Sequence, residues 1–494
     1  DDEFQDYHKD FCSILQIPDK IADVEQIIIS LIDKSVVQKR GRYIYISSKN
    51  LTQEIINNMQ EHNEIYSFFE RISSLDNQEF FRRFIERLLD HADLPISQQI
   101  SGAILRSDYF DSWKIFEDPF KSNVFQKLAY INPFEAIETL NRLFSDVSNE
   151  EIKNYYAQKF TENPHYPMVA SLDGAIEGWN LILWSLDKIA HYKECFKDAV
   201  SLLFRFSVIE EKTWVNSATS TLASFFYPIT FSSASIQDRI EFINSIDITE
   251  TMNLNCLVSI INHVIAKGSI LNGEPTSGLK LPNKYYKDGE EGRVEREEYR
   301  KFGYDLILKL FESENPFIQK EGFNLINHNL SNFLLYYGWN KLKEIWLKYI
   351  DIDENCKYYL IKLVNEYQKY ENWRKSLSEE DLTNLKQFKN EIIDSFSFRE
   401  EFKHYINSDI LNSEYDIHQY DEYKEKLRKS DLEYAKTLYN NDSKFTEVSG
   451  IIFNIGTDRL SEIAYKYSEI DERKNFAKWD LIKSQFLNLD TKTN

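Results

Sequence analysis

The sequence predicts an all-α protein: an irregular α-solenoid of stacked helix pairs, HEAT-like or tetratricopeptide-like, with a small N-terminal winged-helix element. Two observations and one physical argument favour this fold class. Apolar residues recur at the spacing of helices with one buried face. Gly and Pro are scarce, with 14 and 10 in 494 residues, so tight turns are few. Helix pairs that cannot bury an apolar face alone gain stability by stacking on their neighbours.

The length and the patterning divide the chain into four parts. A chain of 494 residues is too long for one ordinary core. We expect a winged-helix-like domain over residues 1–62, a helical repeat array over 63–266, a long loop over 267–298 and a C-terminal helical array over 299–494. Because the chain begins with Asp1 rather than methionine, we expect it to be part of a longer polypeptide.

The N-terminal element combines a helix with a hairpin. Five apolar residues at helical spacing predict a helix that ends near Ser35: Val24, Ile27, Ile28, Leu31 and Ile32. A polar turn over residues 38–41 and the β-branched and aromatic run 42–46 then predict a short hairpin. Asn50 is placed to cap a second helix through Ile56. Helix, hairpin and helix in this order are the layout of a winged-helix domain.

Helix follows helix from Glu64 onward. Between residues 125 and 144 two helices are separated at Asn132-Pro133, and a proline suits the first turn of the second helix because its missing N–H costs nothing there. Ser235 with Asp238 forms a capping box. Further helices are predicted over residues 176–189, 196–206, 217–226 and 236–246.

The predicted long loop holds two prolines and five of the 14 glycines. Loops of this length inside compact arrays are either functional or disordered. Its aromatic and cationic residues are the candidates for binding a partner: Tyr285, Tyr286, Arg293 and Arg296.

The C-terminal array is predicted to begin with a helix from Tyr299 to Phe311, followed by a helix over residues 317–335. Residues 414–422 are acidic and poor in aliphatic side chains, which indicates a connector. The last helical block ends near Phe486. Six tryptophans at apolar helical spacing are predicted to lie in the core: Trp179, Trp184, Trp214, Trp339, Trp346 and Trp373.

The net charge of -21 limits the classes of partner. It repels phosphate backbones, which disfavours nucleic acid, and it steers cationic partners toward the chain. The four cysteines lie far apart, so neither a disulfide framework nor a zinc site is indicated, and a reducing, cytoplasmic location fits best. No apolar run reaches the roughly 20 residues of a membrane span, so no membrane contact is expected.

The sequence indicates no catalytic residue, no cofactor and no metal. It lacks the glycine-rich loops that cradle phosphates, so any nucleotide hydrolysis is expected outside this chain. His191 and Cys195 stand four residues apart on a predicted helix and could place two metal ligands on one face. A structural zinc site needs four ligands, so a half-buried histidine beside a core cysteine is the favoured interpretation. Acidic residues are so abundant that carboxylate pairs are interpreted as solvated helix faces.

The hairpin offers an alternative, nucleic-acid-binding function. Lys39, Arg40 and Arg42 could contact a phosphate backbone as a wing does. Three charges supply only a modest part of a nucleic-acid footprint, so an ordinary polar turn is the favoured interpretation.

Several segments resemble one family. The run from Val24 to Leu31-Ile32, followed by Arg42-Tyr43-Ile44-Tyr45-Ile46-Ser47, resembles the winged-helix element that follows the nucleotide-binding domain of STAND NTPases. Further segments are similar to a helical region of large bacterial STAND proteins: residues 184–190, 196–206, 216–226, 233–239 and 452–458.

The resemblance implies that this chain is the sensor-bearing C-terminal part of such a protein. In that family, which includes antiphage defence proteins, an effector and an NTPase core precede a winged helix and a helical-repeat sensor. Binding of a protein ligand, such as a phage protein, would release autoinhibition, and the complete protein would then form homo-oligomers. Neither the NTPase core nor the effector lies in this chain, and no catalytic residue of the family maps onto it.

The preferred hypothesis is therefore a ligand-sensing recognition module. Its alternatives are a protein-interaction scaffold with no role in defence and a nucleic-acid-binding regulator that uses the hairpin. An enzyme with a divergent active site is a further alternative, because folds do not determine function.

Overall fold

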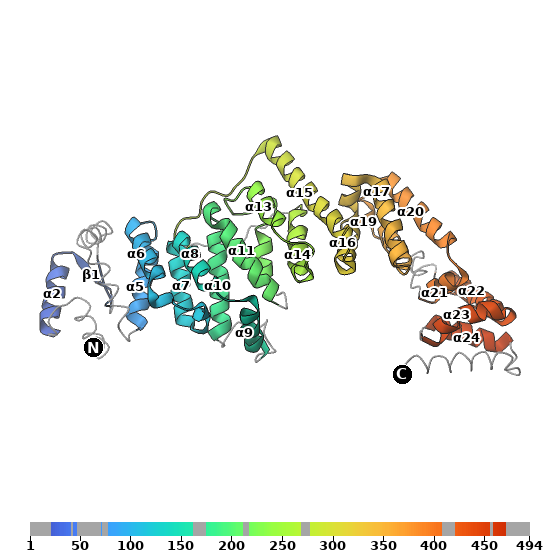
Figure 1. The fold of residues 1–494 in the computed structure, drawn as a ribbon, viewed down its shortest axis with the longest axis horizontal. Coiled ribbons are helices and arrows are strands. Elements are labelled where there is room, and N and C mark those ends of the chain that lie inside the picture. The colour runs from blue at the N-terminus through green and yellow to red at the C-terminus, as the bar shows by residue number, and fades with distance from the viewer. Residues whose placement is uncertain are drawn as a thin grey trace. The chain divides into compact units, whose positions relative to one another are not determined.

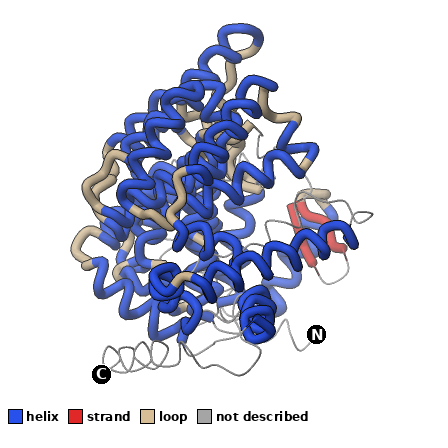
Figure 2. Tube along the Cα trace, turned by 90° about the vertical axis from the view of Figure 1, so that its right-hand side faces the viewer, coloured by secondary structure: helices blue, strands red, loops and turns tan. Residues whose placement is uncertain are grey.

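The computed structural model describes residues 21–40, 43–46, 71, 78–161, 174–210, 217–267, 277–407, 420–454 and 458–470. Of these residues 79% are helical, in 21 α-helices and three 3₁₀ helices, and the strands among them form one two-stranded sheet (Figure 2). The prediction of an all-α, helical-repeat fold is therefore confirmed. The chain divides into two compact units, unit 1 (Asp1–Gly322) and unit 2 (Phe323–Asn494).

The N-terminal part contains a helix and a hairpin. Helix α2 (Ile21–Asp33) precedes the antiparallel strands β1 (Val37–Arg40) and β2 (Tyr43–Ile46). Between helix and hairpin, Ser35 adopts a positive φ of 56°, a left-handed conformation that ends the helical path.

The turn predicted over residues 38–41 is wrong for residues 38–40, and Gly41 lies outside the described residues. Lys39 and Arg40 lie in strand β1, where Arg40 pairs with Tyr43, because the ladder that starts at Val37 continues through these polar residues. The second helix, predicted after Asn50, lies outside the described residues. The winged helix therefore stays a prediction.

A helical array follows in the part of unit 1 that the structure describes (Figure 1). Its α-helices are α5 (Gln78–Asp90), α6 (Pro95–Arg106), α7 (Pro119–Ile131), α8 (Pro133–Phe144), α9 (Asn149–Thr161), α10 (Gly174–Ala190), α11 (Lys193–Ile209), α12 (Ala218–Ser224), α13 (Ile236–Asn244), α14 (Leu254–Val264), α15 (Gly289–Phe311) and α16 (Pro316–His328), which crosses the boundary of the two units. The 3₁₀ helices are η1 (Asp108–Phe110), η2 (Trp113–Glu117) and η3 (Thr251–Asn253). Helices α5, α7 and α10 contact one another in succession, and so do α6, α8 and α11, so the pairs stack in two layers.

The junction of α7 and α8 confirms the predicted break. The Asn132 side chain accepts a hydrogen bond from the Glu135 backbone N–H at 3.1 Å, and Pro133 occupies the first helical position. The capping box of Ser235 and Asp238 is confirmed at the start of α13. Between the pairs, the rings of Phe144 and Phe206 meet edge to face with their centroids 5.0 Å apart.

Helix α15 begins at Gly289 rather than at Tyr299, so the prediction of a loop is wrong for residues 289–298. Acidic residues fill the first turn, where they complement the helix dipole, and Lys287 forms an ion pair with Glu291. These first turns are mostly polar, so they lack the apolar period by which helices are recognised in a sequence.

Unit 2 contains helices α17 (Leu330–Ile352), α18 (Cys356–Lys369), α19 (Glu371–Arg374), α20 (Glu379–Asp394), α21 (Phe398–Asn407), α22 (Tyr420–Asn440), α23 (Asp442–Asn454) and α24 (Asp458–Ile470). The stretch predicted as helical over residues 317–335 consists of two helices, because the non-helical backbone of Asn329 separates α16 from α17. Gly338, with φ of +74°, then kinks α17.

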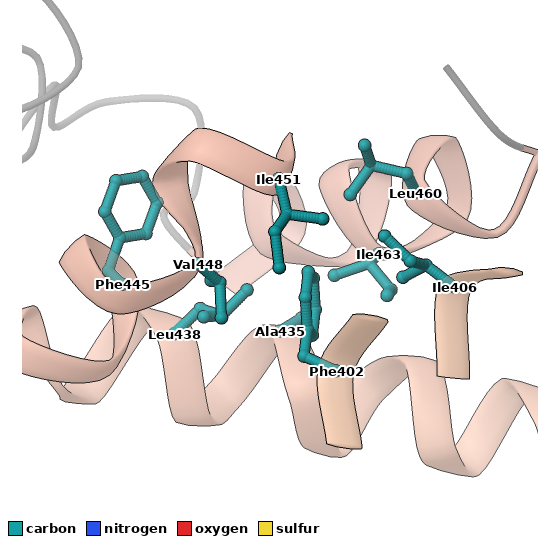
Figure 3. Close-up of a cluster of buried hydrophobic side chains, with 9 residues drawn as sticks. All are labelled: Phe402, Ile406, Ala435, Leu438, Phe445, Val448, Ile451, Leu460 and Ile463. Carbon is teal, nitrogen blue, oxygen red and sulfur yellow. The ribbon is translucent and has the colours of Figure 1, made fainter. Parts of the chain in front are cut away.

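Helices α21 to α24 enclose an apolar core (Figure 3). Its buried side chains are Phe402, Ile406, Ala435, Leu438, Phe445, Val448, Ile451, Leu460 and Ile463. Farther toward the N-terminal end of unit 2, the Trp346 indole is fully buried and donates to the Asn327 side chain at 2.8 Å.

The tryptophans do not share one environment. Trp179 and Trp346 are buried, as predicted, whereas Trp184 and Trp373 are each 42% exposed, so their assignment to the core is wrong. Trp339 is half-buried, and Trp214 lies outside the described residues. Within the described ranges, every helix is too short or too polar to cross a membrane.

Candidate functional site

An extended segment over residues 277–288, here called the strap, crosses the helical array of unit 1 before α15. The Leu279 backbone N–H donates to the Tyr130 carbonyl at 2.7 Å, and the Tyr285 N–H donates to the Ser232 carbonyl at 2.8 Å. The ammonium of Lys188, on α10, donates to the Leu279 carbonyl at 3.0 Å. These bonds dock the strap on α7, on α10 and on the loop before α13.

The candidate binding residues from the sequence lie in the strap and in the first turns of α15. Tyr285 is held in place, because its hydroxyl donates to Glu295 at 2.6 Å. Tyr286 is 42% exposed, with the Arg296 guanidinium 5.4 Å from its ring centroid. Arg296 also donates to the Lys287 carbonyl, and Arg293 forms an ion pair with Glu290. The structure thus brings Tyr286 and Arg296 together, whereas Arg293 is occupied by its own helix.

The hairpin residues of the nucleic-acid alternative are placed only in part. Lys39 and Arg40 lie in β1, but their side chains are outside the described set, and so is Arg42. Their contact with a phosphate backbone stays a prediction.

Helices α8 and α11 border a cleft of about 370 Å³, here called the acidic cleft. The residues that give it its chemistry are Phe134, Glu135, Glu138, Glu194, Cys195 and Asp198. A second cleft of about 350 Å³ lies between α6 and the start of α8. Asn132 lines both clefts, so the two adjoin along the layer formed by α6, α8 and α11.

Most carboxylates of the acidic cleft are not neutralised. Glu135 forms an ion pair with Arg106. Glu138, Glu194 and Asp198 are exposed and make no ion pair with any described residue. The pKa of the Cys195 thiol is raised to about 12, mainly by burial and in addition by the charges of these three carboxylates. Three of the four carboxylates of the cleft therefore carry a negative charge that no ion pair with a described residue offsets.

An aromatic ring forms one wall of the acidic cleft. Phe134 is 44% exposed, although large apolar side chains are usually buried. Its ring packs edge to face on Tyr192, with the centroids 5.7 Å apart. A cation that entered the cleft would meet carboxylates and an aromatic face together, a combination that favours Lys and Arg side chains.

A buried carboxylate lies elsewhere in unit 1, at the start of α12. Glu210 is 7% exposed, and its carboxylate accepts from the Ala218 N–H at 2.8 Å and from the Trp179 indole at 3.2 Å. Burial raises the pKa of Glu210 to about 7, although these hydrogen bonds favour the charged form.

Glu210 should make the stability of the protein depend on pH. The pKa of Glu210 in the folded protein lies above the ordinary value of 4.5, so the folded state binds this proton more tightly than the unfolded state does. The proton stabilises the fold fully below pH 4.5, and this stabilisation is lost as the pH rises to about 7. The free energy of unfolding of the wild type, relative to Glu210→Gln, should fall by about 3 kcal/mol between pH 4 and pH 8. Urea unfolding of both proteins at pH 4 and at pH 8 measures these free energies. A difference between the two proteins that does not change with pH would contradict the raised pKa of Glu210. Asp187, whose pKa burial raises to about 6, titrates in both proteins and cancels.

Sequence reasoning missed the acidic cleft, although it had singled out Cys195. His191, its proposed partner, packs on Phe225 with the ring centroids 5.4 Å apart, while Cys195 is among the residues that line the cleft. Among the described residues, no three His, Cys, Asp or Glu side chains are placed to hold a metal ion. The carboxylates that surround the cleft come from two helices about 60 residues apart in sequence, and nothing in their spacing marks them.

Known proteins do not identify the function of this site. No protein-family model, no curated protein and no solved structure matches the chain. The acidic cleft, with its unpaired carboxylates and its exposed ring, is therefore the candidate functional site on physical grounds. It combines a concave surface with a negative charge, which attracts a positively charged partner.

Proposed function

We propose that this chain is a protein-recognition module whose acidic cleft binds a basic segment of a partner protein. The observation that carries the proposal is the cleft itself, which is lined by three carboxylates without an ion pair and by an exposed aromatic ring. No catalytic step, cofactor or metal is assigned to the chain.

The chemistry of the cleft fits arginine or lysine side chains. A volume of about 370 Å³ is at the lower end of the range of small-ligand sites and accommodates one or two long side chains. A guanidinium could stack on Phe134 while it donates to Glu138, Glu194 or Asp198. The net charge of -21 would steer a basic partner toward the protein and speed its association at low salt.

The wider setting of the proposal is a switch protein of the STAND type. The resemblance of the helical segments supports a sensor role in which a foreign protein, such as a phage protein, occupies the array and so releases an upstream NTPase core for oligomerisation. Cys195, Cys256 and Cys356 are free and buried, which supports a reducing, cytoplasmic location. The test of this setting is protection from phage in cells, which should require both the NTPase core and the cleft carboxylates.

Neutralising the cleft should weaken the binding of a basic peptide. The probe is a fluorescent nona-arginine peptide, titrated with the full chain at low salt and followed by its polarisation. Loss of three charge-assisted contacts, in the variant with Glu138→Gln, Glu194→Gln and Asp198→Asn, should raise the Kd about 30- to 100-fold.

A matched control separates the cleft from the overall charge. The variant with Glu380→Gln, Glu433→Gln and Glu462→Gln removes the same three charges from exposed positions of unit 2. It should bind the peptide within about twofold of the wild type, because none of these three side chains lines the cleft and exposed charges are screened by solvent and salt. Equal weakening in both triple variants would mean that the peptide senses only net charge and would overturn the proposed site.

A further inference from the structure

The strap and the acidic cleft share one residue, Tyr192, at the junction of α10 and α11. The Tyr192 ring supports the cleft wall by packing on Phe134. Its hydroxyl donates to the Leu279 carbonyl at 3.2 Å and to the Lys280 carbonyl at 3.3 Å, both in the strap. One side chain thus contacts both elements, and its position depends on both.

The strap is held by hydrogen bonds rather than by a core. None of its residues is fully buried, and its attachment depends on backbone groups that meet Tyr130, Lys188 and Tyr192. Segments with few buried apolar contacts open at a lower free energy than the helices beneath them. The strap can therefore detach while the helical array stays folded.

The docked strap needs glycine at one position. Gly278 has a φ of +85°, and a Cβ atom built there would lie 2.4 Å from the Tyr130 carbonyl oxygen. Any larger residue at this position must push the strap away from α7. Substitution of Gly278 is thus a way to weaken docking without altering the cleft.

We infer that the strap regulates the acidic cleft, because its docking and the binding of a basic segment stabilise each other through Tyr192. When the strap is docked, its carbonyls fix the Tyr192 hydroxyl and so the ring that supports Phe134. When the strap is released, the wall loses this support, and a ligand must order it again at a cost in affinity. Coupling of this kind is reciprocal, so a ligand in the cleft must also hold the strap. The inference rests on the proposed function for its ligand but not for the coupling itself.

The coupling can be measured first without any ligand. Hydrogen exchange of the full chain reports strap docking at the amides of Leu279 and Tyr285, which donate to the array. Phe134→Ala removes none of the hydrogen bonds that hold the strap, yet it should speed exchange at both amides about three- to tenfold, because Tyr192 loses its packing partner. Glu138→Gln, which changes the cleft but not the Phe134 ring, should leave the exchange unchanged. Equal strap exchange in the wild type and in Phe134→Ala would overturn the coupling.

The reverse direction uses nona-arginine as the probe. Gly278→Val should weaken its binding about tenfold, and Tyr192→Phe, which keeps the ring but loses both hydroxyl bonds, about threefold. Asn283→Ala, at an exposed strap position, should bind like the wild type. If the wild type binds the peptide but Tyr192→Phe binds it equally well, the cleft stands and the coupling is wrong. If the wild type does not bind the peptide, the proposed function fails, and the exchange of Phe134→Ala still decides the coupling.

Discussion

Replacing Arg239 by methionine should destabilise unit 1 by about 3 kcal/mol or more, because buried acceptors would lose their donor. Arg239 is fully buried on α13, and its guanidinium donates to the Tyr227 carbonyl at 2.9 Å, the Thr230 hydroxyl at 3.1 Å and the Ala234 carbonyl at 2.9 Å. Burial lowers the pKa of this guanidinium. One side chain therefore holds the loop that precedes α13.

That loop has a wider structural role, which explains the size of the expected effect. Ser232 donates its hydroxyl to the Ala190 carbonyl at 2.9 Å and accepts from the strap residue Tyr285. The loop thus joins the end of α10 to the strap. Native-state amide exchange in α11 gives the free energy of opening. Gln237→Ala, which changes an exposed residue of α13, the helix of Arg239, is the control. If Arg239→Met lowers the free energy of opening no more than the control does, the role assigned to Arg239 is contradicted.

Replacing Phe402 by alanine should destabilise the helical bundle of unit 2 by about 3–5 kcal/mol, the usual cost of a large cavity in a core. Phe402 is fully buried in the cluster of Figure 3 and meets the Tyr434 ring edge to face at 5.5 Å. Because α21 to α24 all contribute to this cluster, the cavity would weaken each of them. Amide exchange in α22 measures the loss.

An exposed aromatic residue of the same bundle provides the control for Phe402. Tyr465, on α24, is 50% exposed, so Tyr465→Ala removes a ring but opens no cavity. It should change the free energy of opening by less than about 1 kcal/mol. Similar losses for the two variants would mean that the cluster is not the core of the bundle.

Helices with one buried face could be predicted from the sequence, because their apolar period and their caps are local signals. The junction at Asn132-Pro133 and the capping box at Ser235 lie where the sequence indicates. The start of α15 could not be predicted, since its first turns are polar and contain Gly289 and Gly292. Gly292 is required by packing rather than by a turn, because a Cβ atom there would lie 1.8 Å from the Lys287 carbonyl oxygen.

The candidate site depends on tertiary contacts that leave little trace in the sequence. Strap docking uses backbone carbonyls, which are the same for every residue type, so the contact of Lys188 with Leu279 has no sequence signature. The cleft carboxylates are hidden among 80 acidic residues. Phe134 alone hints at the site, because it is an aromatic residue in the first turn of α8. The sequence does not reveal, however, that its ring stays exposed in the folded array.

The most direct test of the proposed function is a crystal structure of the full chain with nona-arginine bound. The proposal predicts a guanidinium in the acidic cleft, within about 6 Å of the Phe134 ring centroid and hydrogen-bonded to Glu138, Glu194 or Asp198. The strap should be docked in the same structure, with Tyr192 bonded to Leu279. A peptide bound at another surface while the cleft stays empty would contradict the proposal.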